Sequence, residues 1–246
     1  MAPNPYYFKR QDNTNQQITK ALTPTEQQKV ILYIICGYTL GILILWHMPV
    51  LKYLLYPFKL VTVAFHEFSH AFVGILTGAK ILAIKLDPNE GGSTTMTGGS
   101  LYCTLPAGYL GSSFIGALMI FCGFNETATK VASVLIVLCL LVTLFWSRNI
   151  LSAVVSISFI AVIILLWVFW DGKGLKYIIL FMGVMSCFYS LWDIVDDLIA
   201  RKVNDSDATL FAKATGFSSR CCGCLWLMVS LIFFVGSVLL GIVAFK

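Results

Sequence analysis

The amino-acid sequence predicts an all-α polytopic membrane protein with about seven transmembrane helices and a small β-hairpin element between the second and third helices. Three observations lead to this fold class. Hydrophobic residues make up 58% of the 246-residue chain and charged residues only 12%, about half the share of a soluble domain. The apolar residues are gathered into blocks long enough to cross a bilayer. One Gly-rich stretch with β-favouring flanks interrupts these blocks.

The chain divides into a polar N-terminal tail, residues 1–28, and a single multi-span membrane domain, residues 29–246. The tail is rich in Asn, Gln and Thr and has no apolar core of a signal peptide, so we expect the first apolar segment to be a retained anchor. The segments of spanning length are, in chain order, about 30–47, 60–77, 106–122, 131–146, 150–170, 175–199 and 225–245.

The stretch 78–104 differs from the rest of the membrane domain. It contains the β-favouring run KILAIKL and then the turn-forming run DPNEGGSTTMTGGS. The next apolar segment is expected to begin at Pro106, because proline is favoured in the first turn of a helix. The sequence therefore predicts one or two hairpins between two spans, either at the surface or as a re-entrant element enclosed by protein.

The formal charge of +5 is small and scattered, so it indicates no nucleic-acid partner. In a membrane protein, Lys and Arg are better used as markers of the cytosolic side. If all seven segments cross and the N-terminus is cytosolic, eleven basic residues fall inside and six outside. We therefore expect an integral, multi-pass membrane protein with a cytosolic N-terminus.

The second apolar segment carries the signature His66-Glu67-Phe68-Ser69-His70. An H-E-x-x-H run on a helix places two imidazoles one turn apart on the same face, where both can bind one metal ion. The intervening Glu67 can then take a proton from a metal-bound water, which attacks a carbonyl. The alternative is a pair of core histidines bonded to neighbours, but ionisable groups in a membrane segment are costly and generally functional.

Two histidines are too few for a catalytic zinc ion, which normally has three protein ligands. His47 lies at the end of the first span and fits poorly, so the candidates are carboxylates near the end of the sixth span. Asp193 is the one most embedded in apolar sequence and is the predicted third ligand, with Asp197 as the alternative. Asp196 lies beside both, and whichever aspartates do not bind the metal would support its ligands.

These motifs together resemble the site-2 protease clan of intramembrane zinc metallopeptidases, in particular its B-like branch found in fungi, plants and bacteria. The resemblance covers about residues 50–245. It is carried by the segments FHEFSHAFVGILTGAKI, LPAGYLGS, SLWDIVDDLI and NDSDATLFAKATG. One departure concerns the distal motif, because better-known members have an Asp-Gly pair in an Asn-Pro-rich run, whereas here Ile194 follows Asp193.

The resemblance implies that His66 and His70 bind Zn²⁺, that a distal Asp completes the site and that Glu67 is the general base. The implied substrate is a membrane protein, cut within or beside one of its helices. The stretch 80–104 would then either offer unpaired strand edges to an extended substrate or form a structural hairpin that plugs the bundle. Two other functions stay open: a catalytically inactive membrane adaptor or chaperone that retains the fold, and a metal transporter, which would require more His or Asp residues along a path.

Overall fold

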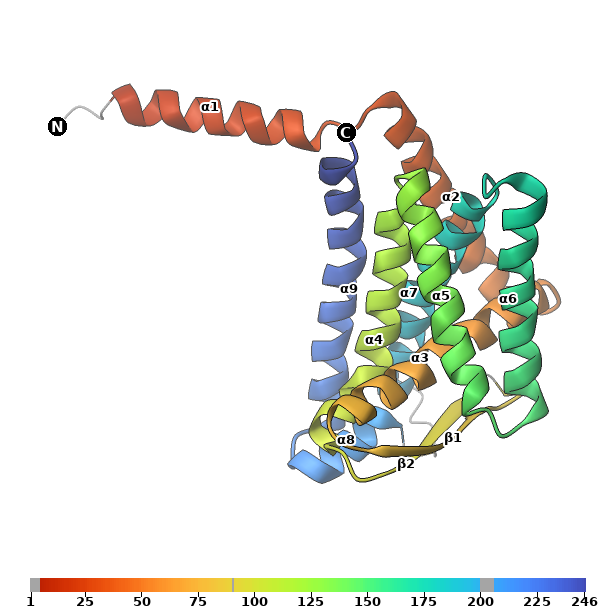
Figure 1. Ribbon diagram of the computed structural model, residues 1–246. Helices are drawn as coiled ribbons and strands as arrows, with labels where there is room; N and C mark the ends of the chain where they lie inside the picture. The colour runs from red at the N-terminus through yellow and green to blue at the C-terminus, as the bar shows by residue number, and fades with distance from the viewer. Residues whose placement is uncertain (1–4, 90, 200–205) are drawn as a thin grey trace.

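The protein is a bundle of long helices with one small hairpin at its end (Figure 1). The computed structural model describes residues 5–89, 91–199 and 206–246, and only the backbone of residues 5–13 and 196–199. The elements are α1 (Pro5–Leu22), α2 (Glu26–His47), η1 (Leu51–Leu54), α3 (Tyr56–Leu76), β1 (Lys80–Leu86), β2 (Gly92–Thr97), α4 (Leu101–Cys122), α5 (Glu126–Phe145), α6 (Ile150–Trp170), α7 (Leu175–Ile199), α8 (Asp207–Thr215) and α9 (Ser219–Ala244).

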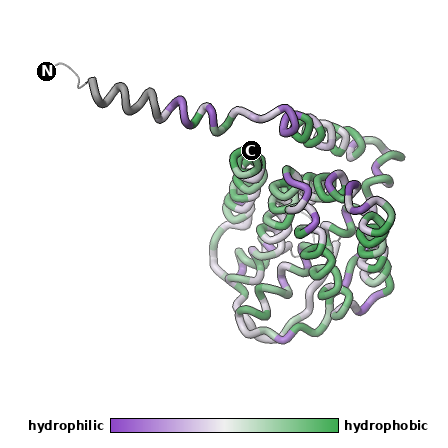
Figure 2. Tube along the Cα trace, turned by 45° about the horizontal axis from the view of Figure 1, so that its top comes forward, coloured by the Kyte–Doolittle hydropathy of each residue, from purple (hydrophilic) through white to green (hydrophobic). Residues whose placement is uncertain are grey.

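Within the described residues, six helices are long and apolar enough to cross a membrane: α2, α4, α5, α6, α7 and α9. With α3, which carries the polar signature, they are the seven helices that the sequence predicts. Figure 2 shows hydrophobic residues along the helices of the bundle and hydrophilic residues in the described part of α1. The predicted class, an all-α polytopic membrane protein with a hairpin between its second and third predicted helices, is confirmed.

Side-chain caps set several helix starts. Thr25 and Gln28 form a reciprocal capping box at α2, and Asn125 and Asn149 cap α5 and α6 by accepting hydrogen bonds from backbone N–H groups. The predicted start of the third span at Pro106 is wrong, because α4 begins at Leu101 and includes Pro106 in its second turn. A proline this near a helix start removes only one backbone hydrogen bond, so the helix extends through it.

Helix α4 lies at the centre of the bundle and packs against α3, α7 and α9. Small residues on α4 make these approaches possible, as their pattern in the sequence suggests. A Cβ atom at Gly111 would overlap the Ser69 side chain on α3. A Cβ atom at Gly116 would lie 2.8 Å from Cys187 Sγ on α7. The absence of side chains at these positions therefore sets how closely α3 and α7 can pack against α4.

The strands β1 and β2 form an antiparallel hairpin, in which Ile84 pairs with Thr94 and Leu86 with Gly92. The outer edge of β1 is bound to the link between α5 and α6. Ile84 N–H donates to the Trp146 carbonyl at 2.8 Å, and Arg148 N–H donates to the Ile84 carbonyl at 3.1 Å. This link fixes the hairpin to the bundle, and among the described residues no strand pairs with the outer edge of β2.

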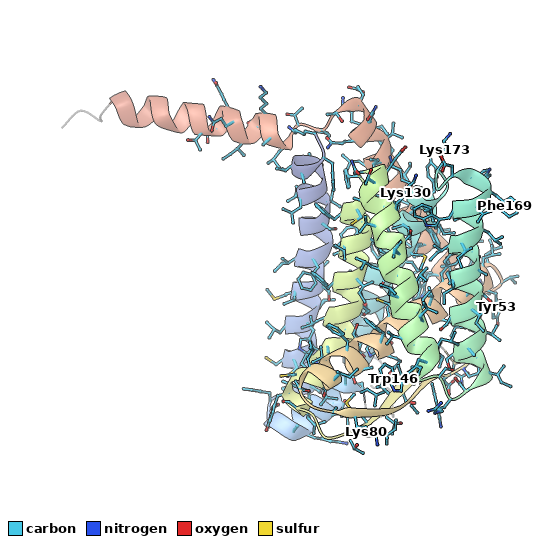
Figure 3. The ribbon with its side chains drawn as sticks, viewed as in Figure 1. Tyr53, Lys80, Lys130, Trp146, Phe169 and Lys173 are labelled. Carbon is cyan, nitrogen blue, oxygen red and sulfur yellow. The ribbon has the colours of Figure 1, made fainter. Side chains whose placement is uncertain are left out.

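The start of α2 and the end of α9 lie together. Gln28 Nε2 donates to the carbonyls of Ile242 at 3.0 Å and Phe245 at 3.1 Å. The hairpin and α8 lie at the opposite end of the bundle (Figure 1). Figure 3 shows the same division, with Lys130 and Lys173 at one end and Lys80 and Trp146 at the other. In Figure 1, α3 runs obliquely across the half of the bundle nearer the hairpin, whereas α4, α5, α6 and α9 stand upright.

Candidate metal centre

Helix α3 places both histidines of the signature on one face. The rings of His66 and His70 meet edge to face with their centroids 4.6 Å apart, and their Nε2 atoms are 3.0 Å apart. This follows from the four-residue spacing, which corresponds to about one helical turn. The polar ends of the two rings therefore converge on a single point, as predicted from the sequence.

Helix α4 orients His70. The Nδ1 atom of His70 lies 2.7 Å from the Thr104 carbonyl oxygen, which can only accept a hydrogen bond. A neutral His70 must then carry its proton on Nδ1, which leaves the lone pair of Nε2 free for a metal ion. The ring of His66 packs edge-on against Tyr109, also on α4, with centroids 4.8 Å apart. Both rings are thus held in place from the same neighbouring helix.

The carboxylate that joins the two histidines belongs to Asp207. Its Oδ2 atom lies 3.0 Å from His66 Nε2 and 3.1 Å from His70 Nε2. Among the residues that the structure describes, His66, His70 and Asp207 form the one group of three whose ligand atoms all lie within 4.8 Å of one another. Asp207 is the first residue of α8, after Ser206, whose side chain caps that helix by accepting from Thr209 N–H.

The position of α8 depends on packing against α4 and α9. Ala208 is buried in a small cluster with Tyr109 and Trp226, and Tyr102 Oη donates to the Ala214 carbonyl at 3.5 Å. Burial alone would raise the pKa of Asp207, but the two imidazoles, through charge and hydrogen bonds, hold that pKa below its usual range. This shift favours the ionised carboxylate, which is the form that binds a metal ion.

The structure does not place the predicted third ligand in this group. Asp193, near the end of the span in α7, is half-buried and is not a member of the described three-residue cluster. The side chains of Asp196 and Asp197 lie outside the described residues. The sequence argument favours aspartates embedded in apolar sequence, whereas Asp207 lies in a polar segment. The signal for Asp207 in the sequence is the segment NDSDATLFAKATG, one of those that carry the family resemblance.

The site fits a metal ion in its donor set and in its space. Two imidazole nitrogens and one carboxylate oxygen are a common ligand set for catalytic zinc. Their separations of 3.0 to 3.1 Å are close to the ~3.3 Å expected between tetrahedral ligands with bonds of about 2.0 Å. A Cβ atom at Gly108 of α4 would overlap both Nε2 atoms, so the lack of a side chain there keeps the space in front of them open.

Glu67 lies beside this group and is almost fully buried, with 4% of its surface exposed. Its Oε2 atom accepts a hydrogen bond from Thr94 Oγ1 of β2 at 2.6 Å. The hairpin therefore covers Glu67 while α4 and α8 cover the two histidines. The site consists of α3, the start of α4, the start of α8 and the hairpin, all at one end of the bundle (Figure 1).

Two histidines and an aspartate beside a buried glutamate, in a bundle of membrane-length helices, are the arrangement that a membrane metallopeptidase of the site-2 protease type requires. Residues 35–237 match the family described as Peptidase M50B-like, and the chain belongs to this family. The match includes α3, the hairpin, α4 and α8, and thus every element of the site. No curated protein and no solved structure matches the chain.

Proposed function

We propose that this protein is an intramembrane zinc metalloprotease that hydrolyses a peptide bond within or beside a membrane helix. The observation that carries the proposal is the convergence of His66, His70 and Asp207 on one point, with Glu67 in the same helical turn as His66. Membership in a peptidase family supports hydrolysis as the reaction. Since the described residues contain a single metal-ligand group and no series of such groups, the transporter is the weaker hypothesis.

In the proposed mechanism, His66 and His70 bind the ion through Nε2 and Asp207 through Oδ2. A zinc ion held there would lower the pKa of water and polarise the scissile carbonyl. Glu67 would take the proton of the attacking water and pass it to the leaving amine. The Thr104 carbonyl, by holding Nδ1–H of His70, keeps that ring in the tautomer that binds the metal.

The location of the site suits a substrate in the membrane. The side chains of His66 and Asp207 are 15% and 16% exposed, so the group lies near the surface at the hairpin end of the bundle. A peptide bond inside a helix is shielded by its hydrogen bonds, and the substrate must therefore be extended locally before it is cut. The outer edge of β2, which no other strand covers in the described sheet, could pair with such an extended segment.

Substrate extension can be tested with two matched transmembrane peptides in proteoliposomes. One has a Leu-Leu pair at its centre and the other a Gly-Pro pair, which weakens the helix by about 4 kcal/mol relative to alanine. We expect the Gly-Pro peptide to be cut faster. Equal rates for the two peptides would argue against recognition of an extended strand.

The function itself is tested by metal content and cleavage measured on the same purified, full-length samples. The wild type prepared without chelators should contain about one zinc ion per chain. Glu67→Gln should keep the zinc and lose cleavage, because it lacks the base but not the ligands. His66→Ala should lose both. A metal-free wild type would refute the proposal, and a zinc-loaded wild type that cleaves no membrane substrate would favour the adaptor.

A further inference from the structure

The proposed general base is held by the hairpin as well as by its own helix. Thr94 Oγ1 lies 2.6 Å from Glu67 Oε2 and 3.0 Å from the Glu67 backbone carbonyl. A hydroxyl has a single proton, and the shorter contact, to a carboxylate, is the stronger of the two. One oxygen of the Glu67 carboxylate is therefore tied to β2.

The other carboxylate oxygen faces Gly92, two residues earlier on the same strand. A Cβ atom at Gly92 would lie 2.5 Å from Glu67 Oε1, 2.7 Å from its Cγ and 2.9 Å from its Cδ. Gly92 has no positive φ angle, so its backbone conformation does not require glycine. What requires glycine here is space, because any side chain would displace the Glu67 carboxylate.

Gly92 and Thr94 contact Glu67 together because residues two apart on a strand point to the same face. Their partners on β1, Leu86 and Ile84, are almost fully buried, which marks this as the inner face of the hairpin. The Leu86 carbonyl also accepts a hydrogen bond from Asn149 Nδ2 at 2.6 Å. The strand that holds Glu67 is thus anchored, through β1, to the start of α6.

We propose that Thr94 is a positioning residue that holds the Glu67 carboxylate in one orientation for proton transfer, and that Gly92 provides the space this orientation needs. The proposal rests on the proposed proteolytic function, in which Glu67 is the base. A carboxylate held at one oxygen by a hydroxyl can still accept a proton at the other. The hairpin would then contribute to the chemical step, in addition to any part in substrate binding.

Kinetics of matched variants test this role. The substrate is fluorescein-labelled β-casein, an unstructured protein, with the full-length enzyme in detergent micelles. We expect Thr94→Val, which keeps the branched shape but lacks the hydroxyl, to lower kcat about 10- to 100-fold with KM and zinc content unchanged. Thr94→Ser, which keeps the hydroxyl, should stay within about threefold of the wild type. Thr95→Val, on the exposed neighbouring residue of the same strand, is the control.

Gly92 provides a second, independent pair of variants. Gly92→Ala should lower kcat because its methyl group would displace the Glu67 carboxylate. Gly91→Ala is the matched control, since a Cβ atom there would meet only Asp87 Cβ at 3.7 Å. In the Glu67→Gln background, neither Thr94→Val nor Gly92→Ala should reduce the residual rate further, because both act through Glu67.

An infrared measurement gives a readout that does not depend on activity. The carboxyl band of Glu67, identified by its loss in Glu67→Gln, should shift in Thr94→Val and stay in place in Thr94→Ser and Thr95→Val. If Thr94→Val does not fold, Thr94→Ala takes its place. The proposal is overturned if removal of the hydroxyl changes neither kcat nor the band, or if Thr94→Ser is as slow as Thr94→Val. If the zinc-loaded wild type cuts neither casein nor a transmembrane peptide in proteoliposomes, the proteolytic function fails, and the band alone decides whether Thr94 holds Glu67.

Discussion

At the scale of single residues, His70 shows how the candidate metal centre depends on backbone groups. Its Nδ1–H donates to the Thr104 carbonyl, while its Nε2 faces His66 and Asp207. Every residue type has a backbone carbonyl, so this partner has no signature in the sequence. The same holds for Gly108, whose lack of a side chain keeps the space in front of the two Nε2 atoms open. The sequence identifies the ligands on α3, but their orientation comes from α4.

The third ligand is tested by exchanging one aspartate at a time. Asp207→Asn removes a charged ligand oxygen, and we expect zinc affinity to fall by at least about 100-fold, beyond what loss of an outer-shell partner causes. Asp193→Asn is the matched control and should keep the zinc. Affinity is measured by competition with a fluorescent zinc chelator. If Asp193→Asn loses the metal and Asp207→Asn keeps it, our assignment of the third ligand is wrong.

The space in front of the histidines is tested by Gly108→Ala. The added methyl group would overlap both Nε2 atoms, so the zinc content should fall well below one per chain. The overpacking should cost about 1–3 kcal/mol of stability, which leaves a folded protein to measure. Gly41→Ala on α2 is the control, because a Cβ atom there would meet nothing within 4 Å. A zinc-replete Gly108→Ala protein would show that the ion does not occupy this space.

At the scale of elements, the hairpin is held by the cap of another helix. Asn149 Oδ1 caps α6 by accepting from Ser152 N–H, and Asn149 Nδ2 donates to the Leu86 carbonyl on β1. One side chain thus joins the start of a membrane-length helix to the strand pair that covers Glu67. A helix N-cap is predictable from an asparagine before an apolar run, but its second bond to a distant strand is not.

The two caps of α5 and α6 provide a matched comparison. Asn125→Ala removes only a cap, and we expect it to lower the free energy of unfolding by about 1 kcal/mol with cleavage unchanged. Asn149→Ala removes a cap and the bond to β1, so it should lower the free energy of unfolding by about 2 kcal/mol and also lower kcat. Unfolding in denaturant and casein cleavage measure the two effects. Equal effects of both substitutions on cleavage would mean that anchoring of the hairpin does not matter for catalysis.

At the scale of the whole molecule, the contact between Gln28 and the end of α9 bears on how the chain crosses the membrane. Seven full crossings would place the start of α2 and the end of α9 on opposite faces, whereas their hydrogen bonds require the same face. Six candidate spans satisfy this condition if α3 enters the membrane obliquely and leaves it on the side it came from. The metal centre then lies toward the face opposite the termini.

This topology predicts that tags at both ends of the chain are accessible from the same side. Protease protection of N- and C-terminal tags in sealed vesicles should show both tags cut or both protected. A cysteine introduced at position 85 on β1 should react with a membrane-impermeant thiol reagent in the vesicles where the tags are protected, and should not react where the tags are cut. Opposite results for the two tags would establish an odd number of crossings. Lys52→Cys, in η1, would then locate the linker before α3.

The charge rule does not fix the orientation of such a molecule. With six crossings, eight basic residues fall on the face of the termini and eight on the face of the metal centre, in contrast to the excess that seven crossings predict. The first set is 9, 10, 20, 29, 130, 173, 176 and 246, and the second is 52, 80, 85, 148, 201, 202, 213 and 220, while Lys59 is buried within α3. Equal sets favour neither orientation, so the cytosolic N-terminus stays a prediction.

The sequence by itself determined the membrane class, the long helices, the hairpin and the pair His66 and His70 with Glu67 between them. All of these follow from local patterns, since apolar length and four-residue spacing act within one element. Only the tertiary structure decided that Asp207 joins the histidines, that Thr94 holds Glu67 and that the ends of α2 and α9 meet. These depend on contacts between segments 27 to 217 residues apart, and burial, not local pattern, selects them.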